Sequence, residues 1–194
     1  MQVLKQQKEE KILEASAKLF ATRQFHEVLL SDVAAAAGVG KGTIYTYFKN
    51  KDELYRSVLY RGFTELLESL RQRLKDEVHQ PRESLEVVVR EYVDYAHRNP
   101  HLFELMRTVS VKASERAKWA QKRQELSDLI ESIIRGGIDL GHFEDPYPEL
   151  TALFIPGLLR SALLYGAKNM NADILAEHIL RMVEAAIIRR AGPS

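Results

Sequence analysis

A short basic stretch near the start of the chain holds the residues whose types and spacing are best suited to chemistry. Between Gly38 and Lys51 there are three lysines, two tyrosines and two threonines, and no acidic residue. Lysine ammonium groups and tyrosine hydroxyls are common donors to phosphate oxygens. Gly42 has no side chain, so the backbone there can approach another molecule closely. The stretch therefore predicts contact with the backbone and base edges of a nucleic acid.

Residues 31–51 are expected to form two short helices joined by a tight turn. Ser31 can cap the first helix, an alanine run continues it, and Gly38 can end it in a left-handed conformation. A second helix is expected from about Gly40 to Tyr47. Its inward-facing residues are expected to be Val39, Ile44 and Phe48. This is the pattern of a helix-turn-helix motif, whose second helix lies in the DNA major groove.

The run from Ala36 to Leu54 resembles the signature of the TetR (TetR/AcrR) family of transcriptional regulators. It reads Ala-Gly-Val, a small residue, Lys-Gly-Thr, an aliphatic residue, Tyr-x-x-Phe, x-x-Lys, and two acidic residues before a leucine. The resemblance implies a homodimeric regulator, most often a repressor, that binds a palindromic operator in double-stranded DNA and is released by a small-molecule effector. The residues that it implies for DNA contact, the last of them on a phosphate, are Ser31, Gly40, Lys41, Gly42, Thr43, Tyr45, Tyr47 and Lys51.

Three positions depart from the family pattern. Gly40 and Leu29 stand where the family usually has serine and threonine, whose hydroxyls cap the two helices and touch phosphate. The glycine that usually ends the first helix is also absent, so Gln24 is expected to adopt a left-handed conformation. These departures bear on affinity and sequence preference rather than on the fold.

Composition excludes several classes of protein. The chain has 194 residues, of which 45% are hydrophobic and 28% are charged, and it has no cysteine. Disulfides and thiolate metal sites are therefore excluded. Without a long apolar run or a signal segment, the chain is expected to be cytoplasmic, with no membrane partner. Residues 1–60 carry a net charge of +2 and the remainder carries −1, so any affinity for nucleic acid must come from local charge.

Hydrophobic periodicity predicts an all-α fold of about nine helices with no convincing strand. Residues 1–50 are expected to form a helix-turn-helix DNA-binding domain, and residues 51–194 a helical effector-binding and dimerisation domain. Besides the two short helices, the expected helices span about 9–22, 52–75, 81–98, 101–109, 114–140, 149–168 and 172–190. In the family, the helix at 52–75 connects the two domains.

Aromatic and polarizable residues gather on the middle helices, where they suit a flat or apolar ligand. The predicted ligand-binding residues are Tyr92, Tyr95, Phe103, Met106, Trp119, Phe154 and Tyr165. Arg107 and Arg160 could meet an anionic group of such a ligand. Stripes of this kind also form ordinary helical cores, and that alternative stays open.

The last two helices carry more apolar surface than one small helical body readily covers. The resemblance implies that they pack against a second copy of the chain. The residues predicted at this dimer interface are Leu159, Leu163, Ile179, Met182 and Val183. The alternative is that they fill the core of a single chain.

Catalytic and metal sites are not predicted. Asp94 with His97, and His101 with Glu104, have the i, i+3 spacing of helical metal ligands, but Pro100 breaks the register between them. No nucleophile elbow or phosphate-binding glycine loop is present in the sequence, and no cofactor is expected. The other functions left open are a DNA-binding regulator without a small-molecule effector, such as an activator or one controlled by a protein, and a helical ligand- or metal-binding protein without DNA function.

Overall fold

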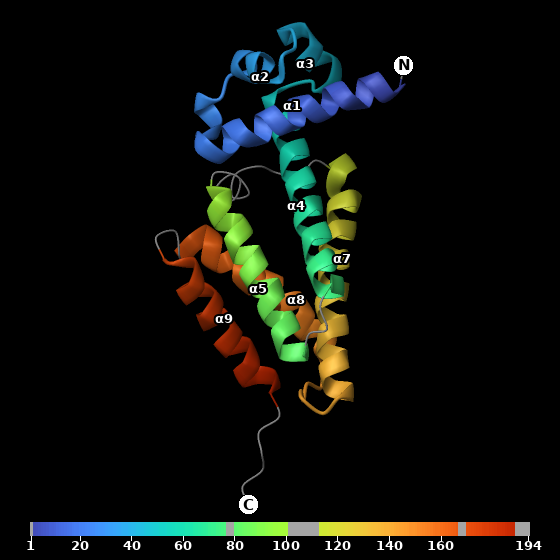
Figure 1. Ribbon diagram of the computed structural model, residues 1–194, viewed down its shortest axis with the longest axis vertical. Coiled ribbons are helices and arrows are strands. Elements are labelled where there is room, and N and C mark those ends of the chain that lie inside the picture. The colour runs from blue at the N-terminus through green and yellow to red at the C-terminus, as the bar shows by residue number, and fades with distance from the viewer. Residues whose placement is uncertain (1, 77–79, 101–112, 167–169, 189–194) are drawn as a thin grey trace, which may run out of the picture. The chain divides into compact units, whose positions relative to one another are not determined.

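The computed structural model describes residues 2–76, 80–100, 113–166 and 170–188, and these are nearly all helical (Figure 1). The predicted all-α fold is confirmed, and the described ranges contain no strand beyond one isolated bridge between Phe143 and Ile188. The helix expected at 101–109 lies outside the described residues. The elements are α1 (Gln2–Thr22), η1 (Phe25–Glu27), α2 (Leu30–Ala37), α3 (Lys41–Tyr47), α4 (Lys51–Asp76), α5 (Pro81–Arg98), η2 (Ala113–Glu115), α7 (Arg116–Asp139), α8 (Pro148–Ser161), η3 (Ala162–Gly166) and α9 (Ala172–Ile187).

The chain divides into two compact units. The first, here called the head, comprises Met1–Phe63 and Arg98–Ala113, and the second, the body, comprises Thr64–His97 and Ser114–Ser194. Helix α4 runs through both units, and its first half packs as part of the head. The domain boundary expected between residues 50 and 51, where α4 begins, stays a prediction.

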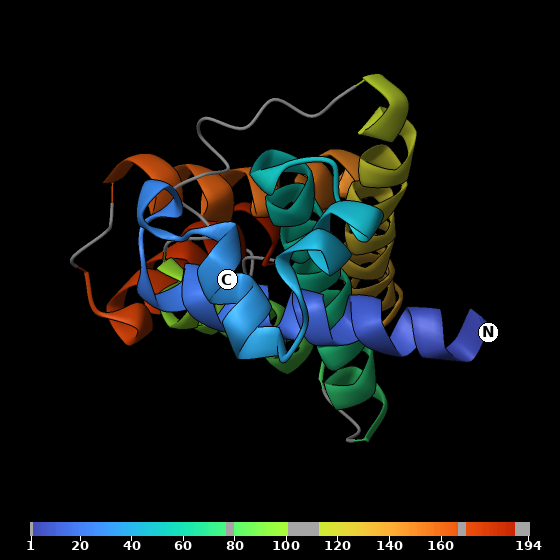
Figure 2. The same cartoon turned by 90° about the horizontal axis from the view of Figure 1, so that it is seen from above.

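The head is built around one hydrophobic core. Helices α2 and α3 lie together on one side of α1 (Figures 1 and 2). They have eight and seven residues, and helices this short are not stable without tertiary packing. The buried residues that supply this packing are Ile12, Phe20, Val28, Val33, Ala34, Ile44, Phe48, Leu54, Tyr55 and Val58.

The segment between α1 and α2 departs from two expectations. Gln24 has extended geometry, with φ −64° and ψ 150°, so the left-handed conformation expected there was wrong. The chain reverses instead through the short helix η1, and the carboxylate of Glu27 accepts the Gln24 N–H at 2.9 Å. Ser31 was expected to cap α2, but it lies inside the helix, and Leu29 holds the cap position.

Helix ends elsewhere differ from the expected bounds by a few residues. Helix α1 begins at Gln2 rather than near Glu9, because residues taken for a frayed lead continue the same helix. Helix α8 ends at Ser161, where a π-helical turn, η3, replaces the expected continuation toward residue 168. The expected starts at Pro81 and Ala172 are confirmed, and the Asn171 side chain caps α9 by accepting the Asp173 N–H at 2.8 Å.

Ion pairs join the helices of the body around an apolar core. Arg71 of α4 pairs with Glu125 of α7 at 3.0 Å, and Arg73 of α4 pairs with Glu91 of α5 at 2.6 Å. Arg82 of α5 reaches Glu184 of α9 at 2.6 Å, in keeping with the side-by-side course of α5 and α9 in Figure 1. Partly exposed pairs of this kind contribute only about 0–1 kcal/mol each to the free energy of unfolding. Their main effect is to favour these helices as neighbours.

The end of α7 depends on Gly137, one of two adjacent glycines near the end of that helix. A side chain at Gly137 would place its Cβ within about 3 Å of the buried Phe143 ring. The carbonyl of Gly137 also accepts the N–H of His142 at 2.8 Å and of Phe143 at 3.1 Å. Gly137 therefore lets the turn after α7 fold back tightly against the helix.

Gly137→Ala should lower the free energy of unfolding by about 1–3 kcal/mol, because a buried ring must shift to admit the methyl group. Gly136 is the matched control, since its Cβ would meet nothing within 4 Å. Gly136→Ala should leave stability unchanged or raise it by up to about 1 kcal/mol. Urea denaturation followed by circular dichroism measures both. Equal stability of the two variants would contradict the packing of Phe143 against Gly137.

Candidate functional site

The turn between α2 and α3 has a defined backbone geometry. Gly38 is left-handed, with φ 65° and ψ 36°, as predicted. The N–H of Gly38 donates to the Ala35 carbonyl at 3.2 Å, and the N–H of Val39 donates to the Ala34 carbonyl at 3.0 Å. Gly40 then caps α3 with extended geometry, and its carbonyl accepts the Thr43 N–H at 2.9 Å. These hydrogen bonds hold α2 and α3 in one relative orientation.

Helix α3 has one buried face and one exposed face. Ile44 is fully buried in the head core, and Phe48, which follows the helix, is 3% exposed. Lys41, Gly42 and Tyr45 are exposed, with Tyr45 at 51%. Of the other predicted DNA-binding residues, Gly40 and Ser31 are exposed, whereas Thr43 and Tyr47 are half-buried. The structure thus brings the predicted residues of α3 together at one end of the head.

Gly42 lies in open space, because a Cβ added there would meet nothing within 4 Å. Packing within the chain therefore gives no reason for a glycine in the first turn of α3, where alanine would favour the helix by about 1 kcal/mol. A close approach by another molecule would give such a reason.

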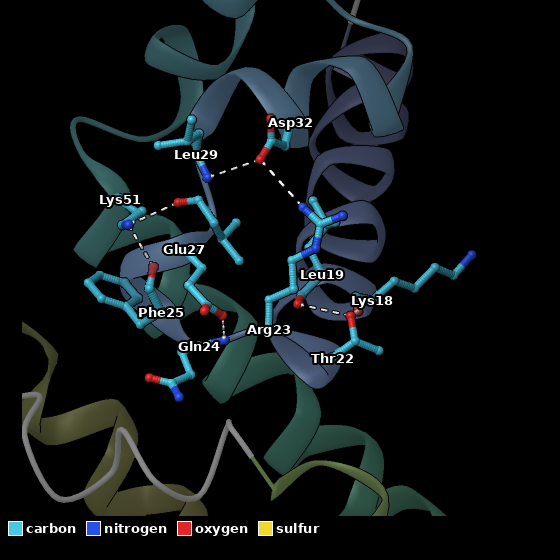
Figure 3. Close-up of polar contacts among 11 residues, drawn as sticks. Lys18, Leu19, Thr22, Arg23, Gln24, Phe25, Glu27, Leu29, Asp32 and Lys51 are labelled. Carbon is cyan, nitrogen blue, oxygen red and sulfur yellow. Dashed lines mark hydrogen bonds and ion pairs between the residues drawn. The ribbon is translucent and has the colours of Figure 1, made fainter.

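Lys51 is held differently from the other predicted DNA-binding residues (Figure 3). Its Nζ donates to the Phe25 carbonyl at 2.6 Å and to the Val28 carbonyl at 2.9 Å, and it lies 4.4 Å from the centre of the Phe25 ring. The ammonium group of Lys51 is therefore engaged within the head. Its predicted contact with phosphate stays a prediction.

Two acidic residues near α2 were missed by the sequence analysis. The carboxylate of Asp32 accepts the Leu29 N–H at 3.4 Å and pairs with Arg23 at 3.5 Å, and Glu27 caps η1 (Figure 3). An acidic residue three positions after a cap residue is half of a capping box, so the spacing of Leu29 and Asp32 was the available signal. Asp32 supports the start of α2 where the family's threonine is absent.

The predicted ligand-binding residues that the structure describes differ in burial. Tyr92 and Trp119 are buried, at 4% and 6% exposure, and Tyr95 is half-buried. Phe154 and Tyr165 are exposed, at 59% and 69%. The last two, Phe103 and Met106, lie outside the described residues, as does Arg107.

Tyr92 has a pKa that its surroundings change. Burial raises the pKa of Tyr92 to about 12, and the charge of Arg160 offsets part of that effect. The phenol is therefore neutral at physiological pH and keeps its proton as a hydrogen-bond donor. The influence of Arg160 shows that a positive charge lies near the buried hydroxyl.

The predicted dimer residues lie mostly in the core of the single chain. Leu159, Ile179 and Val183 are at most 5% exposed, and Leu163 is half-buried. Met182 is 50% exposed. Met182 belongs to a set of large exposed apolar residues on α8, η3 and α9, here called the α8–α9 apolar face: Leu150, Leu153, Phe154, Leu158, Tyr165, Ile174 and Met182.

The described residues hold no group of three or more His, Cys, Asp or Glu side chains that could bind a metal ion. The two ring nitrogens of His97, which has metal-ligand spacing with Asp94, lie 2.9 Å from the Val93 carbonyl and 3.1 Å from the Met170 carbonyl. His101 and Glu104 lie outside the described residues. Among the helices described, none is long and apolar enough to cross a membrane.

Comparison with known proteins gives the same assignment at both ends of the chain. Residues 12–58 match the bacterial regulatory proteins of the tetR family, and residues 78–164 match the tetracyclin repressor-like C-terminal domain. The chain is 30% identical over 187 residues to YhgD, an uncharacterized HTH-type transcriptional regulator of Bacillus subtilis. The aligned region covers 92% of this chain and 93% of YhgD.

Two solved structures share the fold. One is the regulator FadR from Bacillus subtilis in complex with stearoyl-CoA, with a TM-score of 0.72, 20% identity, and coverage of 90% of this chain and 96% of that one. The other is AibR in complex with isovaleryl coenzyme A and operator DNA, with a TM-score of 0.67, 18% identity, and coverage of 90% and 97%. The matched regions and the similarity to YhgD over nearly the whole length show that this chain belongs to the TetR family of helix-turn-helix transcriptional regulators.

Proposed function

We propose that this protein is a repressor that binds a palindromic operator as a homodimer and leaves it when a small apolar molecule binds to the body. The observation that carries the proposal is the division of α3 into a buried face, at Ile44, and an exposed face, at Lys41, Gly42 and Tyr45. A helix of seven residues can present its exposed face to a major groove only if the buried face anchors it.

In this proposal the N-terminal turn of α3 enters the major groove. Lys41 and Thr43 reach base edges from the first turn, and Gly42 lets the backbone approach the DNA. Tyr45 and Tyr47 donate hydrogen bonds to phosphate, as do groups near Ser31 and Gly40 at the two helix starts. The net charge of only +1 keeps non-specific affinity modest, which suits a regulator that must release its site.

A second copy of the chain is the proposed occupant of the α8–α9 apolar face. Phe154 and Leu158 are one helical turn apart on α8, and they are 59% and 40% exposed. Exposed apolar residues gathered on adjacent helices mark interaction surfaces in soluble proteins. In this proposal the two α3 helices of the dimer enter successive major grooves, whose centres lie about 34–36 Å apart.

The effector class that we propose is the acyl-CoA thioester. FadR is bound to stearoyl-CoA and AibR to isovaleryl coenzyme A in the solved structures that share this fold. The body of this chain has a buried Trp119 and a buried, neutral Tyr92 near a positive charge, which suit an apolar chain that carries a polar group. A regulator without an effector is the alternative, and the exposure of Phe154 and Tyr165 favours it.

Release requires the ligand to bind the DNA-free state more tightly than the DNA-bound state. Helix α4 is the proposed lever, because it runs from Lys51 in the head to Asp76 in the body. Arg71 and Arg73 tie its second half to α7 and α5, so a ligand that shifts either helix would act on α4 directly.

Gly42→Ala should separate stability from DNA binding. The methyl group has open space within the chain and should raise the free energy of unfolding by up to about 1 kcal/mol. It should weaken binding to the DNA upstream of the protein's own gene by about tenfold or more, since it obstructs a close approach worth at least 1.4 kcal/mol. Fluorescence anisotropy measures the affinity, with Gly136→Ala as the control that should leave it unchanged. Unchanged affinity in Gly42→Ala would show that the backbone there does not approach DNA.

Phe154→Glu and Leu158→Glu should each convert the dimer into a folded monomer. Both residues are exposed in the single chain, so the carboxylate harms only an interface, where an unpaired charge costs several kcal/mol. Light scattering should give twice the 22.2 kDa chain mass for the wild type and the chain mass for the variants, which should also lose operator binding. Ala120→Glu, at an exposed position of α7, is the control. Dimeric variants with normal affinity would place the interface elsewhere.

Acyl-CoA binding should be visible through Trp119, the single tryptophan of the chain. Stearoyl-CoA should change its fluorescence and weaken operator binding by about 5–150-fold, and the operator should weaken stearoyl-CoA binding by the same factor. Free CoA, which lacks the acyl chain, is the control. An operator affinity that no acyl-CoA alters would reject this effector class and favour a regulator without one.

A further inference from the structure

We propose that Lys51 is a positioning residue for DNA binding. It holds the segment between α1 and α2, residues 23–29, against the first turn of α4. Its ammonium group binds that segment and not a phosphate. The proposal rests on DNA binding by the head. Among the lysines of the basic stretch, Lys51 then supports DNA binding by holding the protein backbone in place and not by contacting DNA.

The contacts of Lys51 engage most of its ammonium group (Figure 3). Two N–H groups are used by the carbonyls of Phe25, at 2.6 Å, and Val28, at 2.9 Å. The Phe25 ring lies beneath the ammonium at 4.4 Å, in the range of a cation–π interaction. Hydrogen bonds from a charged donor are stronger than those from a neutral one, so both contacts hold the segment firmly.

The place of Lys51 in α4 supports the same role. It is the first residue of the helix, where the helix dipole disfavours a cation. The turn around it is fixed by other contacts, because the Asn50 side chain accepts the Glu53 N–H at 2.9 Å and Glu53 accepts the Lys49 N–H at 3.2 Å. The carbonyls of Phe25 and Val28 offset the unfavourable dipole at this position.

The segment that Lys51 holds leads directly into α2. Phe25 packs on Phe20 and Tyr55, with ring centres 6.0 and 5.3 Å away, and Val28 is fully buried. Leu29 follows as the cap residue of α2. Since α2 and α3 are joined by the fixed turn at Gly38, the start of α2 sets the position of α3. A substitution at Lys51 is therefore expected to shift α3 through the backbone of α2.

Lys49 offers a matched comparison two residues earlier in the chain. Its side chain is exposed, whereas that of Lys51 is half-buried. A direct phosphate contact releases counterions and contributes about 0.9 to the slope of log K against log salt, whereas a positioning contact contributes nothing to that slope. The salt dependence of DNA binding therefore separates the two roles.

The experiment measures binding of the protein, with both head and body present, to its upstream DNA between about 50 and 200 mM KCl. Lys51→Met should weaken binding by about tenfold at every salt concentration with an unchanged slope, because two carbonyls lose a donor. Lys51→Gln keeps two N–H donors without the charge and should recover most of the affinity at the same slope. Lys49→Gln should instead reduce the slope by about 0.9.

A second readout needs no DNA. In NMR spectra of the protein labelled at lysine, the side-chain protons of Lys51 should be shifted upfield by the Phe25 ring, and Phe25→Leu should remove that shift. If the wild type failed to bind DNA, the proposed function would fall, while this measurement would still test the contact.

The proposal would be overturned by a slope reduced by about 0.9 in Lys51→Gln, by unchanged affinity in Lys51→Met, or by the absence of a ring-current shift on Lys51. Should Lys51→Met not fold, Lys51→Gln and the NMR shift decide the matter. A loss of affinity in Lys51→Met that Lys51→Gln does not relieve would also count against it, because a hydrogen-bond donor would then not be what the position requires.

Discussion

The burial of one face of α3 is the constraint on which the head depends. Seven residues cannot hold a helix in water without help, since nucleation is costly and few hydrogen bonds follow. Ile44 and Phe48 supply that help by entering the core of the head. The same burial decides which residues face outward, and Lys41, Gly42 and Tyr45 owe their exposure to it. The burial of Ile44 and Phe48 therefore stabilises α3 and also exposes the residues that we propose to contact DNA.

Much of the fold could be predicted because local chemistry decides it. Gly38 ends α2 in a left-handed conformation, and Pro81 begins α5, as their backbone preferences require. The conformation of Gln24 could not be predicted, because the glycine that is usual in the family is absent there. The chain reverses instead through an extended residue followed by the short helix η1. The exposed face of α3 followed from the same periodicity that predicted Ile44 in the core.

The remaining features depend on contacts between residues distant in sequence. Lys51 lies 23 and 26 positions from the carbonyls that it binds, so its type and spacing indicated only a surface cation. In the body, periodicity predicts that α8 and α9 have apolar faces. It does not predict which of these faces is buried within the single chain. Ile179 was therefore expected at a dimer interface and is buried in one chain, whereas Phe154 was expected near a ligand and is exposed.

A footprint on the upstream DNA tests most directly the claim that two α3 helices read a palindromic site. Hydroxyl-radical cleavage in the presence of the protein should show two protected segments related by a two-fold axis. Their centres should lie about 10–10.5 base pairs apart, or slightly more, as two successive major grooves require. A single unsymmetrical protected segment, or uniform protection along the fragment, would contradict recognition by a symmetric pair of helices.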